Sequence, residues 1–413
     1  MPARSVSEVP ASAQRRKNKG SAAGLPRSYS SRPSSGALMR IVIKLGSCII
    51  TSKGGVDRER IKQIADQICR LPHDFAIVTS GAISTGMKKL GIVEKPQDVT
   101  MQQVLAAVGQ TSLVNEYEMA FDHRKMVAQV LLTNYDFSDR MKYLNVQNTL
   151  LTLMRKGIVP IINENDTVTV GDIKKIAFRD NDSLSAHVAV SIYADILIIF
   201  TDVNGLYTKN PKEPGAELVK IIKEITDAEF EMCKGGNAAG RGGMVSKIRA
   251  AKMAGEVGIK VVIANGSEEN AIVKVLNGEI GTTILPMHKI NPKKYWIAFA
   301  STPKGKIFIN EGAENAIIHE KGSLLSQGVS KSEGNFDKGD VVEILNQKGE
   351  VIAKGITNYF STEIPRIIGL SEDEIFNSLG YAYREAVPRA SMVVMDGVNG
   401  GNGKNGSGKF KTG

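Results

Sequence analysis

Strand-like and helix-like segments alternate from Met39 to Pro286, and this alternation limits the fold more than any other feature of the sequence. Short apolar runs typical of buried strands are separated by longer segments with the spacing of amphipathic helices. Such alternation predicts an α/β layered domain around a largely parallel sheet. The expected strands are 41–45, 75–79, 126–132, 158–162, 195–201 and 260–264, and the expected helices are 58–71, 99–120, 138–156, 183–194 and 245–258.

The pattern of alternating strands and helices ends at Pro286. A short basic stretch, residues 287–294, leads into brief strand-like runs at 295–300, 306–309, 340–345 and 351–357, with one expected helix at 313–321. Glycines separate these runs, as in small antiparallel folds. We therefore predict an α/β domain over 39–286, a linker over 287–294 and a small, mostly-β barrel over 295–396.

The net charge of +10 first suggests a nucleic-acid partner, but it is confined to the ends of the chain. Residues 1–38 hold seven Lys or Arg and one Glu, and residues 397–413 hold three Lys and no acidic residue, which leaves the body at +1. The first tail has almost no large apolar side chains and the second is rich in Gly and Asn, so we expect both to be disordered. The Arg- and Ser-rich first tail is either a plain extension or an organelle transit peptide.

Two further features narrow the class of protein. No apolar run reaches 18 residues, which argues against a membrane-spanning helix. The three cysteines, Cys48, Cys69 and Cys233, lie far apart without metal-binding spacing, as expected in a reducing compartment. The sequence thus predicts a cytoplasmic protein.

Two stretches at expected strand ends carry donors suited to an anion. Lys44 precedes Gly46 at the end of the first strand, and Ser80 precedes Gly81 at the end of the second. Because ligands of open α/β sheets bind at the carboxyl ends of the strands, an ammonium group and free backbone N–H groups here could hold phosphate. Each stretch alone also fits a solvated lysine or an ordinary helix cap.

Two clusters of short polar side chains lie about fifteen residues apart, at 163–166 (NEND) and 180–183 (DNDS). Their carboxylate and amide groups could hold an ammonium group or a reacting group, although such residues are also common in solvated turns. A fourth stretch, 201–207 (TDVNGLY), follows the most apolar strand.

A fifth stretch, 240–247 (GRGGMVSK), is expected to be a glycine-rich loop that runs into a helix with Lys247 near its start. The backbone N–H groups of such a loop and the positive end of the helix form an anion site.

Together these stretches resemble the amino acid kinase family, in particular its members that phosphorylate glutamate and carry a C-terminal PUA domain. The motifs are KLGS (44–47), VTSGA (78–82), NEND (163–166), DND (180–182), TDVNGLYT (201–208) and GGMVSK (242–247), and GNFDKGDVVEIL (334–345) resembles a PUA domain. The resemblance covers about 39–390 and implies a three-layer kinase sandwich followed by a PUA barrel.

The resemblance also implies a reaction and a site. The γ-phosphoryl group of ATP would pass to the side-chain carboxylate of L-glutamate, the first step toward proline, with Mg²⁺ bridging the phosphates. Lys44 and Lys247 would stabilise the transferring group and Asp182 would orient them; Ser80, Asp166 and Asn181 would bind glutamate. The ATP-binding residues would be Lys44, Thr201, Asp202, Arg241, Gly242, Gly243, Met244, Val245, Ser246 and Lys247.

Several points stay open at this stage. Arg241 stands where the family commonly has a small hydroxyl residue, and 167–179 belongs to a loop that varies among members and is implicated in proline inhibition. Another acceptor (aspartate, N-acetylglutamate or a nucleoside monophosphate) is the alternative within the family. RNA binding by the PUA domain is a second alternative, which the mixed charges of 289–396 do not favour. The family further implies a homo-oligomer, either a dimer or a tetramer.

Overall fold

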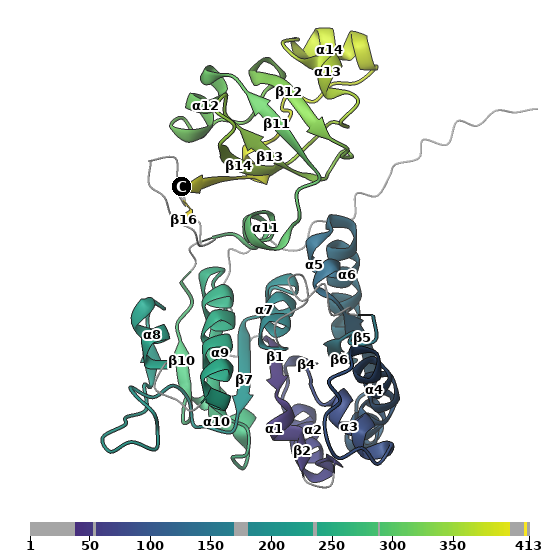
Figure 1. Cartoon of the computed structure of the whole chain (residues 1–413), viewed down its shortest axis with the longest axis vertical. Coiled ribbons are helices and arrows are strands. Elements are labelled where there is room, and N and C mark those ends of the chain that lie inside the picture. Colours follow the sequence, from purple (N-terminus) through teal and green to yellow (C-terminus); the bar gives the residue numbers. More distant parts are fainter. Residues whose placement is uncertain are drawn as a thin grey trace, which may run out of the picture. The chain divides into compact units, whose positions relative to one another are not determined.

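The computed structural model describes residues 38–52, 55–168, 181–233, 238–287, 290–396 and the pair 409–410. Within these ranges lie an eight-stranded sheet flanked by helices and a six-stranded C-terminal sheet (Figure 1). The predicted combination of an α/β domain and a smaller β-rich domain is therefore confirmed. The predicted disordered tails lie outside the described residues, except for Leu38 and a two-residue strand, β16 (Lys409–Phe410), that pairs with β15.

The larger sheet has the strand order β5-β6-β4-β1-β7-β9-β10-β8. Neighbouring strands are parallel except β9 and β10, so the carboxyl ends of β6, β4, β1, β7 and β9 lie at one edge. All six expected strands are present, while the short β8 and β10 were not expected. The strands are β1 (Arg40–Leu45), β4 (Asp74–Val78), β5 (Val127–Leu132), β6 (Val159–Glu164), β7 (Ile196–Thr201), β8 (Ile221–Ile222), β9 (Lys260–Asn265) and β10 (Thr282–Ile284).

Helices cover both faces of this sheet because successive strand residues point to opposite sides. Ile41 and Ile43 of β1 pack with α2 (Arg58–Arg70), α4 (Val99–Phe121) and α10 (Ala271–Asn277). Val42 lies in a second core with α6 (Arg140–Arg155), α7 (Asn181–Ser191) and α9 (Ala238–Glu256). These two cores make the three layers of the domain.

The helices differ from expectation in several places, and α10 is among those that were not expected. The expected helix 138–156 is two helices, α5 (Asn134–Ser138) and α6, because Asp139 accepts a hydrogen bond from Lys142 N and caps the second. The short helix α3 (Ala82–Lys89) was not expected. Helix α9 begins at Ala238, so the expected glycine-rich loop before it is wrong. The remaining short elements of this domain are α1 (Ser47–Ile50), β2 (Thr51–Ser52), β3 (Gly55–Val56) and α8 (Asp227–Met232).

The C-terminal sheet has the order β12-β11-β13-β14-β15-β16 and its own apolar core, which includes Ile307, Ile344 and Ile352. Three of the four expected strands are present. The fourth, 295–300, is wrong: Asn291 caps α11 (Pro292–Tyr295), which continues as a π-helix through Ala300. The other elements are β11 (Gly305–Ile309), α12 (Glu311–Ile318), β12 (Val329–Gly334), β13 (Val341–Leu345), β14 (Val351–Ile356), α13 (Ile364–Ile367), α14 (Glu372–Leu379) and β15 (Met392–Asp396).

Across the described ranges, none of the helices combines the length and the apolar character that crossing a membrane would need. The domain boundaries near 286 and 294 stay predictions.

Candidate active site

The polar residues singled out in the sequence gather at the carboxyl edge of the larger sheet. Lys44 is the penultimate residue of β1, and Asn163 is the penultimate residue of β6. Ser80 follows β4, and Thr201 ends β7. These four strands are neighbours in the order β6-β4-β1-β7, so their ends face the same side. The N-terminus of α7 meets this edge, where Asn181 contacts Thr79 and Asp182 contacts Lys44.

A buried carboxylate lies between two lysines at this edge. Asp182 Oδ1 lies 2.6 Å from Lys44 Nζ, and Asp182 Oδ2 lies 3.1 Å from Lys247 Nζ. Ser246 Oγ donates a hydrogen bond of 2.6 Å to Asp182 Oδ2. The Asp182 residue is only 2% exposed and the lysines are 6% and 8% exposed. The cluster thus places two ammonium groups around a single carboxylate and carries an excess positive charge.

The pKa of Asp182 reflects this setting. Burial of the carboxyl group alone would raise its pKa, but the charges of Lys44 and Lys247 and the hydrogen bond from Ser246 lower it below its usual value. Asp182 is therefore ionised at neutral pH and holds both ammonium groups near one point.

Lys247 reaches the cluster from the middle of a helix, not from its start. It is the tenth residue of α9, and its Nζ also donates to Gly243 O, one turn earlier, at 3.1 Å. The expected anion site at a helix N-terminus is therefore not what positions Lys247. Instead, α9 is held by Ile248, Ala251 and Ala254, which are fully buried against the sheet.

A second, uncharged group of side chains lies beside this cluster. Asn181 Nδ2 donates to Ser80 Oγ at 2.7 Å, to Thr79 O at 3.0 Å and to Asn163 Oδ1 at 3.3 Å. The turn that presents Ser80 depends on Gly81, whose φ of 97° is unfavourable for residues with a side chain. Ser80 and Asn181, both expected to bind substrate, are thus in direct contact.

The other expected residues are more dispersed. Burial raises the pKa of Asp166, and Lys95 lowers it; no contact joins Asp166 to Ser80 or Asn181 among the described residues. Thr201 Oγ1 donates to Asp202 Oδ1 at 3.1 Å. Gly243, Met244 and Val245 lie in α9 directly before Ser246 and Lys247.

Part of the expected site cannot be placed. The Arg241 side chain, the surroundings of Gly242 and the segment 169–180 lie outside the described residues. That segment contains most of the loop expected to respond to proline.

Sequence reasoning missed two residues of α4 that touch this edge. Gln110 Oε1 accepts a hydrogen bond of 2.9 Å from Asn163 Nδ2, and the Tyr117 hydroxyl lies 2.8 Å from Thr79 Oγ1. Both are buried on the same side of the helix as Leu113. An amide side chain within an otherwise apolar helix face was the available signal for Gln110.

The described residues do not provide a protein cage for Mg²⁺. No group of three or more His, Cys, Asp or Glu side chains within them could hold a metal ion, and both carboxylate oxygens of Asp182 face lysines. A Mg²⁺ ion held mainly by nucleotide phosphates and water would need no such cage.

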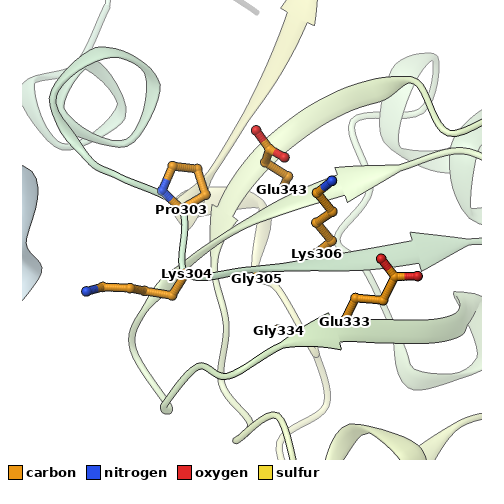
Figure 2. Close-up of a pocket in the computed structure, with 7 residues that line it drawn as sticks. All are labelled: Pro303, Lys304, Gly305, Lys306, Glu333, Gly334 and Glu343. Carbon is orange, nitrogen blue, oxygen red and sulfur yellow. The ribbon is translucent and has the colours of Figure 1, made fainter. Parts of the chain in front are cut away.

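The C-terminal domain has a separate hollow of about 380 Å³ at the ends of β11, β12 and β13. Figure 2 shows its charged side chains, Lys304, Lys306, Glu333 and Glu343. Its lining contains none of the residues expected to act on substrate, and its mixed charges select for neither sign of ligand.

Comparisons with known proteins agree with the two-domain organisation. The family model "Amino acid kinase family" matches residues 39–265, and "PUA domain" matches residues 305–379. "Glutamate 5-kinase" of Thermoanaerobacter sp. (strain X514) is 45% identical over 87% of this chain and 98% of its own length. The proteins of the same name from Dehalococcoides mccartyi (strain ATCC BAA-2266 / KCTC 15142 / 195) and Caldanaerobacter subterraneus subsp. tengcongensis are 44% and 42% identical, over 86% and 87% of this chain and 98% of each relative.

Proposed function

The chain belongs to the glutamate 5-kinases of the amino acid kinase family, and we propose that it carries out their reaction with the Lys44–Asp182–Lys247 cluster as its catalytic centre. In this reaction an oxygen of the glutamate side-chain carboxylate attacks the γ-phosphorus of ATP. The bond from that phosphorus to the β–γ bridging oxygen breaks, giving γ-glutamyl phosphate and ADP. The product is the first intermediate toward proline.

The observation that carries the proposal is the pair of buried ammonium groups around one carboxylate. The attacking carboxylate and the phosphoryl group are both anions, so catalysis depends on positioning and on stabilising negative charge. Lys44 and Lys247 supply that charge at one point of the sheet edge. A carboxylate nucleophile has no proton to lose, so Asp182 is assigned to orienting the lysines and not to acting as a base.

Glutamate is proposed to bind at the uncharged group of side chains next to the lysines. Ser80 Oγ and the amide of Asn181 offer short, neutral hydrogen-bonding groups. Asp166 is half-buried and has no ion-pair partner among the described residues, and it is proposed to pair with the substrate ammonium group. Burying that pair is favourable only when both charges are present.

ATP is the phosphoryl donor of this kinase family, and its site is proposed to include Thr201, Asp202 and residues 241–247. Burial and the charge of Asp202 raise the pKa of Cys48, in α1, while the charges of Lys44 and Lys247 lower it, so all three charged groups act on this one thiol. Gly46 lies directly beside this cluster, since a Cβ there would lie 3.4 Å from Lys44 Nζ. Mg²⁺ is proposed to enter with the nucleotide.

Formation of γ-glutamyl phosphate, trapped with hydroxylamine in the presence of ATP and Mg²⁺, tests the function directly. Aspartate, N-acetylglutamate and a nucleoside monophosphate serve as competing acceptors in the same assay. Product with glutamate and not with the others is the expected result; phosphorylation of another acceptor in place of glutamate would overturn the substrate assignment. Assays with added proline test the expected feedback inhibition, and sedimentation tests the expected dimer or tetramer; both stay predictions, as does a cytoplasmic location.

A further inference from the structure

Three side-chain amides form a chain that passes over the carboxyl edge of the sheet. Gln110 belongs to α4 on one face, Asn163 lies at the end of β6, and Asn181 begins α7 on the other face. Gln110 Oε1 accepts from Asn163 Nδ2 at 2.9 Å, and Asn163 Oδ1 lies 3.3 Å from Asn181 Nδ2. This chain of amides therefore links α4 and α7 at the candidate glutamate site.

The backbone fixes the direction of this chain. The N–H of Glu164 can only donate, and it lies 2.9 Å from the Asn163 side-chain oxygen. That contact identifies Oδ1 as an acceptor and turns Asn163 Nδ2 toward Gln110. Asn181 must then present its own Nδ2 to Asn163, Ser80 and Thr79, which leaves its Oδ1 buried without a hydrogen-bond partner among the described residues.

We propose that Gln110 is a positioning residue for glutamate binding: through Asn163 it holds the Asn181 amide so that the free Oδ1 accepts a hydrogen bond from the substrate ammonium group. The inference rests on the proposed function of this site. Gln110 itself touches neither glutamate nor ATP in this scheme. The ammonium group has three donors, so it can bind Asn181 and Asp166 at the same time.

Packing alone does not account for a glutamine at this position. Gln110 is 6% exposed and lies on the apolar side of α4 with Leu105 and Leu113, where a leucine would fit the pattern. Its Nε2 has no partner among the described residues. A buried donor left unpaired destabilises the fold, so the amide is retained at some cost for the one contact that it makes with Asn163.

Gln110→Leu tests the proposal, with Gln147→Leu as the matched control. Gln147, in α6, is also a buried amide and is 7% exposed. Its Nε2 donates to Ser191 O at the C-terminal end of α7, the helix that begins with Asn181. We expect Gln110→Leu to raise KM for glutamate about 5- to 10-fold, the effect of losing one hydrogen bond. KM for ATP should stay unchanged, and Gln147→Leu should change neither KM.

Gln110→Glu separates positioning from packing. Its carboxyl group keeps an acceptor opposite Asn163 Nδ2, so KM for glutamate should return toward the original value. Equal KM changes in Gln110→Leu and Gln147→Leu, or an unchanged KM in Gln110→Leu, would overturn the proposal. Urea unfolding of all three variants shows whether each is folded under assay conditions. Failure of the parent protein to form γ-glutamyl phosphate would instead overturn the proposed function.

Discussion

Asn181 and Asp182 are adjacent residues at the start of α7, yet they belong to two halves of the site that differ in charge. Asp182 lies between Lys44 and Lys247, with every described partner charged or a hydroxyl group. Asn181 contacts a hydroxyl group, a backbone carbonyl and another amide. One helix start thus separates a charged region suited to phosphoryl transfer from a neutral region suited to recognising an amino acid.

The difference predicts two kinds of defect. A change in the charged half should act on the transition state and lower kcat, because charge builds up there during transfer. A change in the neutral half should act on the bound substrate and raise KM for glutamate. Substituting one residue at a time therefore shows to which half of the site that residue belongs.

The largest effect is expected for Lys247→Ala or Lys44→Ala. Loss of one ammonium group removes stabilisation of the transferring phosphoryl group, so kcat should fall about 10²- to 10³-fold. Steady-state kinetics with the hydroxylamine assay measures the change. Lys274→Ala, which removes a surface ion pair with Glu268, is the control and should stay active. Near-full activity in both site variants would contradict the proposed mechanism.

Asp182→Asn should cost about 3 kcal/mol of unfolding free energy, because it leaves two buried ammonium groups facing each other. The folded-state pKa of Asp182 is below its unfolded value. Its stabilisation is therefore complete above the unfolded pKa and is lost as the pH falls through the folded pKa. Urea unfolding over a pH series should show the free energy of unfolding falling at acid pH in the parent protein, and falling less in the variant. Identical pH profiles would mean that the cluster does not stabilise the fold.

Asp166→Asn should raise KM for glutamate about tenfold, because it removes a charge partner of the substrate ammonium group. Burial raises the pKa of Asp166, so its ionised fraction increases as the pH rises above the usual carboxyl range. KM of the parent protein should fall over that interval. The side chain of glutamate titrates in both proteins, so the ratio of the two KM values isolates Asp166. A ratio that does not change with pH would remove Asp166 from the binding site.

The smallest effect is expected for Ser80→Ala. One hydroxyl group is lost, so KM for glutamate should rise about 5-fold while kcat and KM for ATP change little. Ser84→Ala, in the next turn, removes only a bond to Gly81 O and serves as the control. A fall in kcat without a change in KM for glutamate would place Ser80 in the charged half and contradict its assignment to the neutral half.

The sequence was sufficient for the strands and for the charged half. Buried parallel strands are continuous apolar runs. Lys44, Asp182 and Lys247 were singled out through the family resemblance, and the structure brings them together, while their roles stay predictions. The sequence was misleading at 240–243, where the glycines suggested a loop. Local propensity disfavours glycine in a helix, but the packing of α9 on the sheet outweighs it.

The neutral half was harder to predict because its order comes from contacts between distant segments. Gln110 and Asn163 are 53 residues apart, and Thr79 and Tyr117 are 38 residues apart. No local spacing reveals such pairs. The helix at 295–300 was missed for a related reason. Trp296 Nε1 donates to Phe137 O, a tertiary contact that cannot be predicted from an apolar run typical of strands.

Helices α3 and α4 touch through their backbones. A Cβ on Gly86 would lie 1.9 Å from Leu105 O, and one on Gly109 would lie 1.9 Å from Ala82 O. The turn at Ser80 and Gly81 leads directly into α3, and α3 cannot shift along α4 because their backbones are in contact. An engineered variant that accepts a larger amino acid cannot gain space by shifting this turn. Its redesign would have to shorten side chains of the candidate glutamate site.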